Sequence, residues 1–232
     1  MTKRQVLSDI SKMFDLLGWL SPVRMRLKQL MQKIWQAKLQ WDDVLPKELS
    51  QSYLDWRDKL VTLRNIRLNR CVMKSGQNSS VKLHVFCDAS EIGYAACVYV
   101  VTVDENNQHT SNLLTAKSKV APLKSQSIPR LELCAALLGS NLIASVIECL
   151  EKMGIKIEAQ YAWTDSTIVL NWLSSEPATW SVFVANRVAK IQENSSLSWN
   201  HVSTIENPAD VASRNRSLKT RKSHQLDRKS VV

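Results

Sequence analysis

Four acidic residues lie at the end of an apolar stretch, within one, or directly after a turn, which are positions where a carboxylate can bind a metal ion or take part in catalysis. Asp88 ends the largely apolar stretch KLHVFC, and Asp165 ends the stretch IEAQYAWT. Glu132 lies inside the apolar run PRLELCAALLG, and Asp210 follows the turn signal Asn207–Pro208. A buried charge is costly without a partner, and like charges a few ångströms apart cannot all stay ionised without compensation. A shared divalent cation would provide that compensation.

Magnesium is the cation that such a set of donors favours, because it is a hard ion that takes carboxylate oxygens together with substrate phosphate. Two such ions about 3.5–4 Å apart would activate a water and stabilise the departing oxygen of an in-line phosphodiester cleavage. We therefore predict a site for two Mg²⁺ ions, with Mn²⁺ as the alternative ion, made by Asp88, Glu132, Asp165 and Asp210.

The elements that must position these acids form a mixed α/β pattern. Strands are predicted over residues 82–90, 93–104, 111–121, 157–166 and 196–203, and helices over residues 128–154, 167–175 and 179–194. The helix over 128–154 is long enough for a crossover that makes the first and fourth strands parallel neighbours. Asp88 and Asp165 would then emerge side by side, because functional groups gather at the carboxyl ends of parallel strands.

Taken singly, two of the acids have ordinary structural explanations. Glu132 is expected in the first turn of its helix, where the helix dipole favours a carboxylate by roughly a few tenths of a kcal/mol. Asp210, on a short turn or helix after the last strand, could be an exposed acid or a cap. The helix nevertheless has a face of small residues that would let it approach the sheet closely and leave Glu132 at the rim: Ala135, Ala136, Gly139 and Ser140.

Before the sheet, the pattern is helical. Val6, Ile10, Phe14 and Leu17 form one apolar stripe, and a second stripe follows the break at GWLSP, with Leu27, Leu30, Ile34 and Ala37. A third helix is expected over about residues 47–61. Residues 74–80, KSGQNSS, have the composition of a linker.

The net charge of +10 is unevenly distributed. Residues 1–75 carry 15 Lys and Arg against 7 Asp and Glu, residues 76–213 carry 9 against 13, and residues 214–232 carry 7 against 1. Basic flanks suggest a polyanion such as nucleic acid, although a charge run is more often a solvated face. An acidic centre that handles a polyanion would need a cation to mediate.

The sequence argues against a membrane or secreted protein. We expect no apolar stretch long enough to span a bilayer, and the N-terminus lacks the apolar region of a signal peptide. The five cysteines show no CxxC pair and no zinc-ligand spacing, which is typical of reduced thiols in an intracellular protein.

The order Asp88, Glu132, Asp165 and Asp210 resembles ribonuclease H, whereas integrase and transposase relatives place a glutamate last. More closely, FCDASEIGYAACVY, AKSKVAPLKSQSIPRLEL, YAWTDSTIVLNWL and NPADVASR resemble the pol polyprotein of BEL/Pao-type LTR retrotransposons. Residues 1–73 resemble the segment that joins reverse transcriptase to ribonuclease H. The resemblance covers about residues 4–216, and SIPRLEL is its most specific stretch.

The resemblance implies a fragment of such a polyprotein. Its expected parts are a helical connection or thumb-like segment over residues 1–75, a ribonuclease H-like domain over 76–214 and a basic, disordered tail over 215–232. The domain would have a mixed five-stranded sheet flanked by helices. The implied activity is metal-dependent endonucleolytic cleavage of the RNA strand of RNA/DNA hybrids. The alternative is a catalytically idle nucleic-acid-binding relic.

The resemblance also implies substrate and proton-transfer residues. Ala89 and Ser90 would contact RNA, whose 2′-hydroxyls distinguish it from DNA. His201 is the candidate for the histidine that ribonucleases H usually have before the last acid, although it could equally finish the last strand. Residues 174–180 contain no basic handle, so the basic flanks would grip the hybrid.

Three tryptophans could stack on nucleic acid, but core packing is favoured for at least the first two: Trp163, Trp172 and Trp180. The expected partners are an RNA/DNA hybrid and the reverse transcriptase polymerase domain of the same or another polyprotein, since the chain has no Tyr-x-Asp-Asp motif. The expected location is the cytoplasm, in a virus-like particle, or the nucleus.

Overall fold

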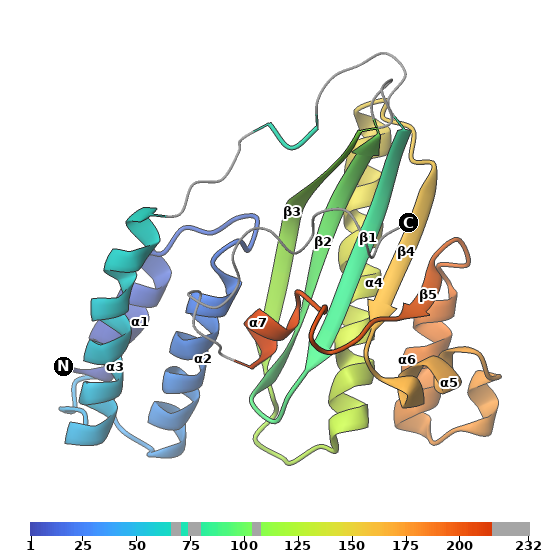
Figure 1. Cartoon of the computed structure of the whole chain (residues 1–232). Helices are drawn as coiled ribbons and strands as arrows, with labels where there is room; N and C mark the ends of the chain where they lie inside the picture. The colour runs from blue at the N-terminus through green and yellow to red at the C-terminus, as the bar shows by residue number, and fades with distance from the viewer. Residues whose placement is uncertain (66–70, 74–79, 104–107, 215–232) are drawn as a thin grey trace.

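The computed structural model describes residues 1–65, 71–73, 80–103 and 108–214. A group of N-terminal helices lies beside a central sheet, and further helices cover the back and the opposite side of that sheet (Figure 1). Most of the predicted linker (residues 74–79) and the predicted tail (residues 215–232) lie outside the described residues.

The sheet has five strands in the order β3-β2-β1-β4-β5. Their bounds are β1 Ser80–Ala89, β2 Gly93–Val103, β3 His109–Val120, β4 Ala159–Thr164 and β5 Ser198–His201. The first three form an antiparallel meander, while β4 runs parallel to both β1 and β5. The predicted mixed sheet is confirmed, including the parallel pairing of β1 with β4.

The helices of this part follow the predicted order. They are α4 (Ile128–Lys152), α5 (Thr167–Leu173), a 3-10 turn (Pro177–Thr179), α6 (Val182–Gln192) and the short α7 (Asp210–Ser213). Because α4 begins at Ile128, Glu132 is its fifth residue, and the expectation that Glu132 lies in the first turn is wrong.

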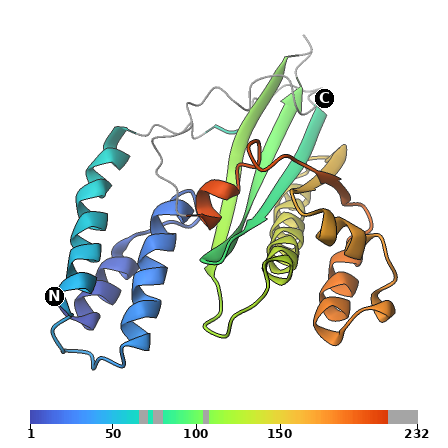
Figure 2. The same ribbon diagram turned by 60° about the horizontal axis from the view of Figure 1, so that its bottom comes forward.

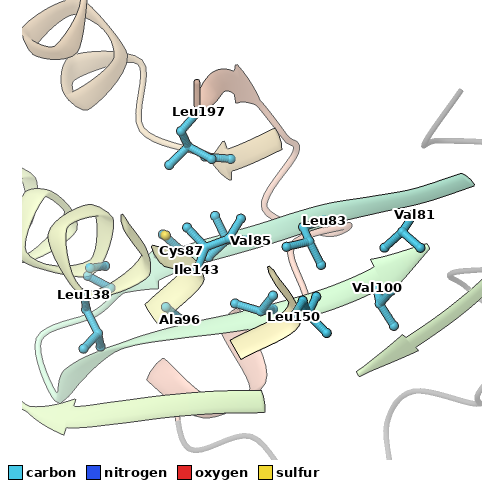
Figure 3. Close-up of a cluster of buried hydrophobic side chains, with 14 of the residues drawn as sticks. Val81, Leu83, Val85, Cys87, Ala96, Val100, Leu138, Ile143, Leu150 and Leu197 are labelled. Carbon is cyan, nitrogen blue, oxygen red and sulfur yellow. The ribbon is translucent and has the colours of Figure 1, made fainter. Parts of the chain in front are cut away.

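Helix α4 packs closely on one face of the sheet. Alternate residues of β1, Leu83, Val85 and Cys87, point into the core beneath it (Figure 3). At Gly139 a Cβ atom would lie 2.3 Å from the Cys87 sulfur, so this contact has no room for a side chain. The small-residue face of α4 therefore allows the close approach that the sequence predicted.

Helix α4 is also long and apolar enough, by length and composition alone, to cross a membrane. The expectation that the chain contains no such stretch is therefore wrong. Its apolar residues have a different use in this fold, because Leu131, Ala135, Ile143 and Leu150 are buried in the core that α4 forms with the sheet.

The N-terminal helices are α1 (Lys3–Lys12), α2 (Ser21–Gln36) and α3 (Lys47–Lys59), and a 3-10 helix over Leu60–Asn65 follows α3. They share a core of their own, to which Val6, Leu27, Ile34, Tyr53 and Trp56 belong.

The predicted apolar stripe of Val6, Ile10, Phe14 and Leu17 is correct only in its first half, which lies on α1. Helix α1 ends at Lys12, and the side chains of Phe14 and Leu17 are 85% and 44% exposed. The physical reason is an interaction with the sheet edge, because the carbonyl of Leu17 accepts hydrogen bonds from Ala116 N and Thr115 Oγ1, both at 2.8 Å. Backbone pairing with β3 ends the helix before the stripe is complete.

Helix α2 continues this docking along β3 (Figure 2). Lys28 Nζ donates to the carbonyl of Ser118 at 2.5 Å, and Gln32 Nε2 donates to the carbonyl of Ala121 at 2.8 Å. Gly18 makes the approach possible, since it has a φ of 73° and a Cβ there would lie 1.7 Å from the oxygen of Ala116. The edge strand is thus covered, which protects its backbone groups from pairing with another chain.

Candidate active site

Two carboxylates lie at the carboxyl ends of neighbouring parallel strands. Asp88 is the penultimate residue of β1, and Asp165 directly follows β4. The register pairs Cys87 with Thr164, so the two acids leave the sheet side by side. Asp165 is held in place by Thr204, whose hydroxyl donates to Asp165 Oδ2 at 2.7 Å.

Glu132 reaches this edge from α4. Its carboxylate lies near the hydroxyl of Ser166, the residue that caps α5, and this hydroxyl favours its charged form. The Ser166 hydroxyl also accepts a hydrogen bond from the backbone N–H of Val169 at 3.3 Å. The serine that caps α5 thus lies beside the acid on α4 and follows Asp165 directly in the chain.

Asp210 reaches the same edge because the segment before it is anchored to β1. The buried Asn207 donates from Nδ2 to the carbonyl of Cys87 at 2.9 Å and accepts at Oδ1 from Ala209 N at 3.1 Å. These bonds fix the turn that begins α7, whose first residue is Asp210. The predicted position of Asp210 on a short helix after the last strand is correct.

The four acids at this edge form one group, called here the carboxylate cluster: Asp88, Glu132, Asp165 and Asp210. Burial raises the pKa of Asp88 to about 6, a hydrogen bond from Ser213 opposes the shift, and the charges of Asp165 and Asp210 add to it. Burial likewise raises the pKa of Glu132 to about 7, with Ser166 opposing and the charges of Asp165 and Asp88 adding.

Three oxygens of the carboxylate cluster are buried without a hydrogen-bond partner: Asp88 Oδ1, Glu132 Oε2 and Asp165 Oδ1. Anionic oxygens left in this state call for a cation, and oxygen donors of this kind suit Mg²⁺. Among the described residues, however, no group of three or more His, Cys, Asp or Glu side chains meets the geometry for holding a metal ion. The donor chemistry fits magnesium, whereas the present spacing is not that of a closed metal cage.

A guanidinium group lies against the carboxylate cluster. Arg214 Nε is 2.7 Å from Asp210 Oδ1, and Arg214 Nη2 is 3.8 Å from Asp88 Oδ1. The hydroxyl of Ser213 donates to Asp88 Oδ2. Neither residue was predicted as part of the site, although the stretch NPADVASR places them three and four positions after Asp210, on the same side of a helix.

The remaining predicted site residues lie at the same edge or on neighbouring strands. Ala89 is buried at the end of β1, and the Ser90 hydroxyl donates to the carbonyl of Ser213 at 2.7 Å. His201 is the exposed last residue of β5, opposite Thr164, so it finishes the last strand. Within the described residues, the hydrogen bonds and ion pairs of the carboxylate cluster do not include His201.

The tryptophans pack mainly in the interior. The Trp163 ring stacks on Phe86 at a centroid distance of 6.0 Å, and its Nε1 donates to His84 Nδ1 at 3.1 Å. Trp172 packs with Trp180 at 6.1 Å, edge to face, against the core between α4 and α6. Core packing of Trp163 and Trp172 is therefore as expected.

Replacing Glu132 by Gln is expected to stabilise the metal-free protein at pH 8 and to leave its stability at pH 4.5 unchanged. The folded-state pKa of Glu132 is raised from 4.5 to about 7. Its contribution to stability is therefore fully present below about pH 4.5 and is lost as the pH rises through 7. Removing the charge should raise Tm at pH 8 by several degrees, because about 1 kcal/mol corresponds to about 2–4 °C for a protein of this size.

Thermal unfolding in a chelating buffer at the two pH values measures this effect. Glu151→Gln, an exposed acid near the other end of α4, is the matched control for the change in charge. A Tm difference between Glu132→Gln and the unsubstituted protein that is equal at pH 4.5 and pH 8 would contradict the burial of an ionisable Glu132.

Comparison with known families gives one match over most of the chain. The family model described as Pao retrotransposon-like RNaseH-like domain matches residues 2–166. The matched residues include Asp88, Glu132 and Asp165 and end before Asp210. A search of curated proteins found no significant match.

Solved structures with a similar arrangement have low sequence identity. The N-terminal RNase H domain of Rv2228c from Mycobacterium tuberculosis is 15% identical, with a TM-score of 0.38, over 59% of this chain and 93% of that one. LC11-RNase H1 in complex with RNA/DNA hybrid is 16% identical, with a TM-score of 0.33, over 56% and 91%. Prototype foamy virus protease-reverse transcriptase is 10% identical, with a TM-score of 0.31, over 87% of this chain and 24% of that one.

Proposed function

Because the chain belongs to the Pao retrotransposon-like RNaseH-like domain family, we propose that it cleaves the RNA strand of RNA/DNA hybrids endonucleolytically, with magnesium as cofactor. One observation carries the proposal. Asp88 and Asp165 lie at the ends of adjacent parallel strands, and each, like Glu132, has a buried oxygen without a hydrogen-bond partner. Such a site suits divalent cations, and pairs of divalent cations promote the cleavage of phosphodiester bonds.

We assign the four acids of the carboxylate cluster as the ligands of two Mg²⁺ ions, with Mn²⁺ as the alternative. When bound, the ions would activate a water and stabilise the departing oxygen. The protein's own part is positioning. Thr204 holds Asp165, Ser166 favours the charged form of Glu132, and Asn207 fixes the turn that delivers Asp210.

Recognition of RNA is assigned to the end of β1. Ala89 and Ser90 follow Asp88 directly, so a strand with its phosphate at the carboxylate cluster would pass them. The Ser90 hydroxyl is already oriented by the carbonyl of Ser213. A backbone or hydroxyl group here could read a 2′-hydroxyl, which is what distinguishes RNA from DNA. His201 would serve proton transfer and product release from the exposed end of β5.

A second candidate is a catalytically idle nucleic-acid-binding protein. The contact of Arg214 with Asp210 and Asp88 favours it, because a cation already compensates two of the four acids. In either case we propose an intracellular setting, cytoplasmic or nuclear. The polymerase domain of a reverse transcriptase, from the same or another polyprotein, is the proposed protein partner.

The purified chain is expected to cut 5′-labelled RNA within an RNA/DNA hybrid in Mg²⁺ and to leave it intact in EDTA. Labelled single-stranded RNA and DNA duplex of the same sequence serve as matched controls and should remain uncut. Binding of the hybrid without any cleavage in Mg²⁺ or Mn²⁺ would favour the idle candidate. Equal cleavage of the hybrid and the DNA duplex would show that the proposed specificity for the RNA strand of a hybrid is wrong.

A further inference from the structure

Arg214 is placed to compensate the charge of two acids at once. It follows α7 directly, and its guanidinium lies 2.7 Å from Asp210 Oδ1 and 3.8 Å from Asp88 Oδ1. The side chains of the two acids are 1% and 0% exposed, whereas that of Arg214 is 34% exposed. The acids are therefore interior groups, and the cation approaches them from the solvent side.

The acids are fixed by bonds that do not involve the guanidinium. Ser213 donates to Asp88 Oδ2, and Asn207 ties the start of α7 to the backbone of β1. The backbone N–H of Arg214 also donates to the carbonyl of Asp210 at 3.1 Å, whereas its guanidinium is joined to the acids through ion pairs at the end of a long, 34% exposed side chain. Its guanidinium can swing outward by side-chain rotation, while Asp88 and Asp210 stay where they are.

A divalent cation in the carboxylate cluster would need the oxygens that Arg214 now approaches, Asp88 Oδ1 and Asp210 Oδ1. Two cations cannot both lie against these oxygens without repelling each other, and the repulsion is strong because the oxygens are buried away from water. The guanidinium and the metal are thus alternative partners of the same atoms.

We propose that Arg214 is a built-in counter-cation of the carboxylate cluster, which a divalent ion displaces when it binds. The inference rests on the proposed function, because it takes the carboxylate cluster as a divalent-cation site. It adds a competition: in the metal-free protein Arg214 compensates the charges of Asp88 and Asp210, and the metal must displace that side chain. The freed guanidinium then stands at the rim of the site, on the side open to an anionic substrate.

Two measurements on the full chain without nucleic acid test the competition, with Mg²⁺ alone as the probe. In Arg214→Gln, calorimetric titration should show Mg²⁺ binding about 10-fold more tightly than in the unsubstituted protein. Thermal unfolding in EDTA should show a lower Tm for the variant, and saturating Mg²⁺ should remove that deficit, because a ligand that binds only the folded state stabilises it. Arg214→Lys, which keeps a charge but loses the planar fork, should fall between the two.

Lys152→Gln controls for the loss of one positive charge, since Lys152 ends α4 far from the carboxylate cluster and pairs with Glu148. Equal or weaker Mg²⁺ binding by Arg214→Gln, with a Tm deficit that Mg²⁺ does not change, would make Arg214 a structural residue and overturn the inference. The proposed function would then stand, because the unsubstituted protein still binds Mg²⁺. Failure of every variant and of the unsubstituted protein to bind Mg²⁺ would overturn both.

Discussion

Replacing Asp165 by Asn is expected to reduce magnesium-dependent cleavage of RNA/DNA hybrid by more than about 100-fold, beyond the 10- to 100-fold loss that outer-shell partners of metal ligands cause. The substitution removes one negative charge from the carboxylate cluster with little change of shape. The amide oxygen can still accept the hydrogen bond from Thr204, which Asp165 Oδ2 accepts now at 2.7 Å. The amide nitrogen would take the place of Oδ1, which is buried without a hydrogen-bond partner.

The fold should survive the change, because an amide donor beside Asp88 and Glu132 relieves repulsion among the acids. We therefore expect an unchanged or higher Tm in metal-free buffer together with the loss of cleavage. The measurement is single-turnover cleavage of labelled hybrid, with hybrid binding measured in parallel. Asp58→Asn, an exposed acid on α3, is the matched control. Full magnesium-dependent activity in Asp165→Asn would remove Asp165 from the proposed ligand set.

The edge of the sheet that carries the carboxylate cluster could be predicted from the sequence because local patterns determine it. The alternation of Leu83, Val85 and Cys87 against His84 and Phe86 indicates a strand with two buried faces. The helix over residues 128–154 is long enough for a crossover, and such a crossover makes β1 and β4 parallel, as they are in the structure. Once that pairing is known, Asp88 and Asp165 must leave the sheet together.

Contacts between distant segments could not be predicted in the same way. The stripe from Val6 to Leu17 suggested a longer helix, but the carbonyl of Leu17 pairs with β3 nearly a hundred residues later. The position of Arg214 over Asp88 depends on Asn207, which anchors α7 to a strand 120 positions earlier. Periodicity describes one element at a time, whereas these contacts depend on how the elements are assembled.

The N-terminal helices are expected to provide much of the binding affinity for the hybrid. Because α2 is docked on the sheet, a truncation would also disturb the rest of the fold. Removing residues 1–75 would uncover β3 and α7, both of which contact α2. Substitutions in the full chain are therefore preferable. Gln32 bonds to Ala121, just past the end of β3, and β3 ends opposite Gly93 at the turn after β1. The last turn of α2 thus lies at the same end of the sheet as the carboxylate cluster.

Two exposed lysines at this end of α2, Lys33 and Lys38, are the residues to replace together by Gln. Phosphate contacts release counterions, so each lost contact should reduce the magnitude of the negative slope of log K against log salt by about 0.9 for duplex and about 0.7 for single strands. We expect the double variant to bind hybrid more weakly and with a shallower salt dependence. Inactive protein carrying Asp165→Asn allows binding to be measured in Mg²⁺ without cleavage.

Lys152 and Lys156, replaced together by Gln, make a control with the same change in net charge. Both are exposed at the far end of α4, where Lys152 lies twenty residues, or about 30 Å along the helix axis, from Glu132. A general effect of net charge would weaken binding equally in the two double variants. If both double variants keep the affinity and salt slope of the protein that carries only Asp165→Asn, Lys33 and Lys38 do not contact the hybrid. A loss confined to Lys33 and Lys38 would place the path of the hybrid across the last turn of α2.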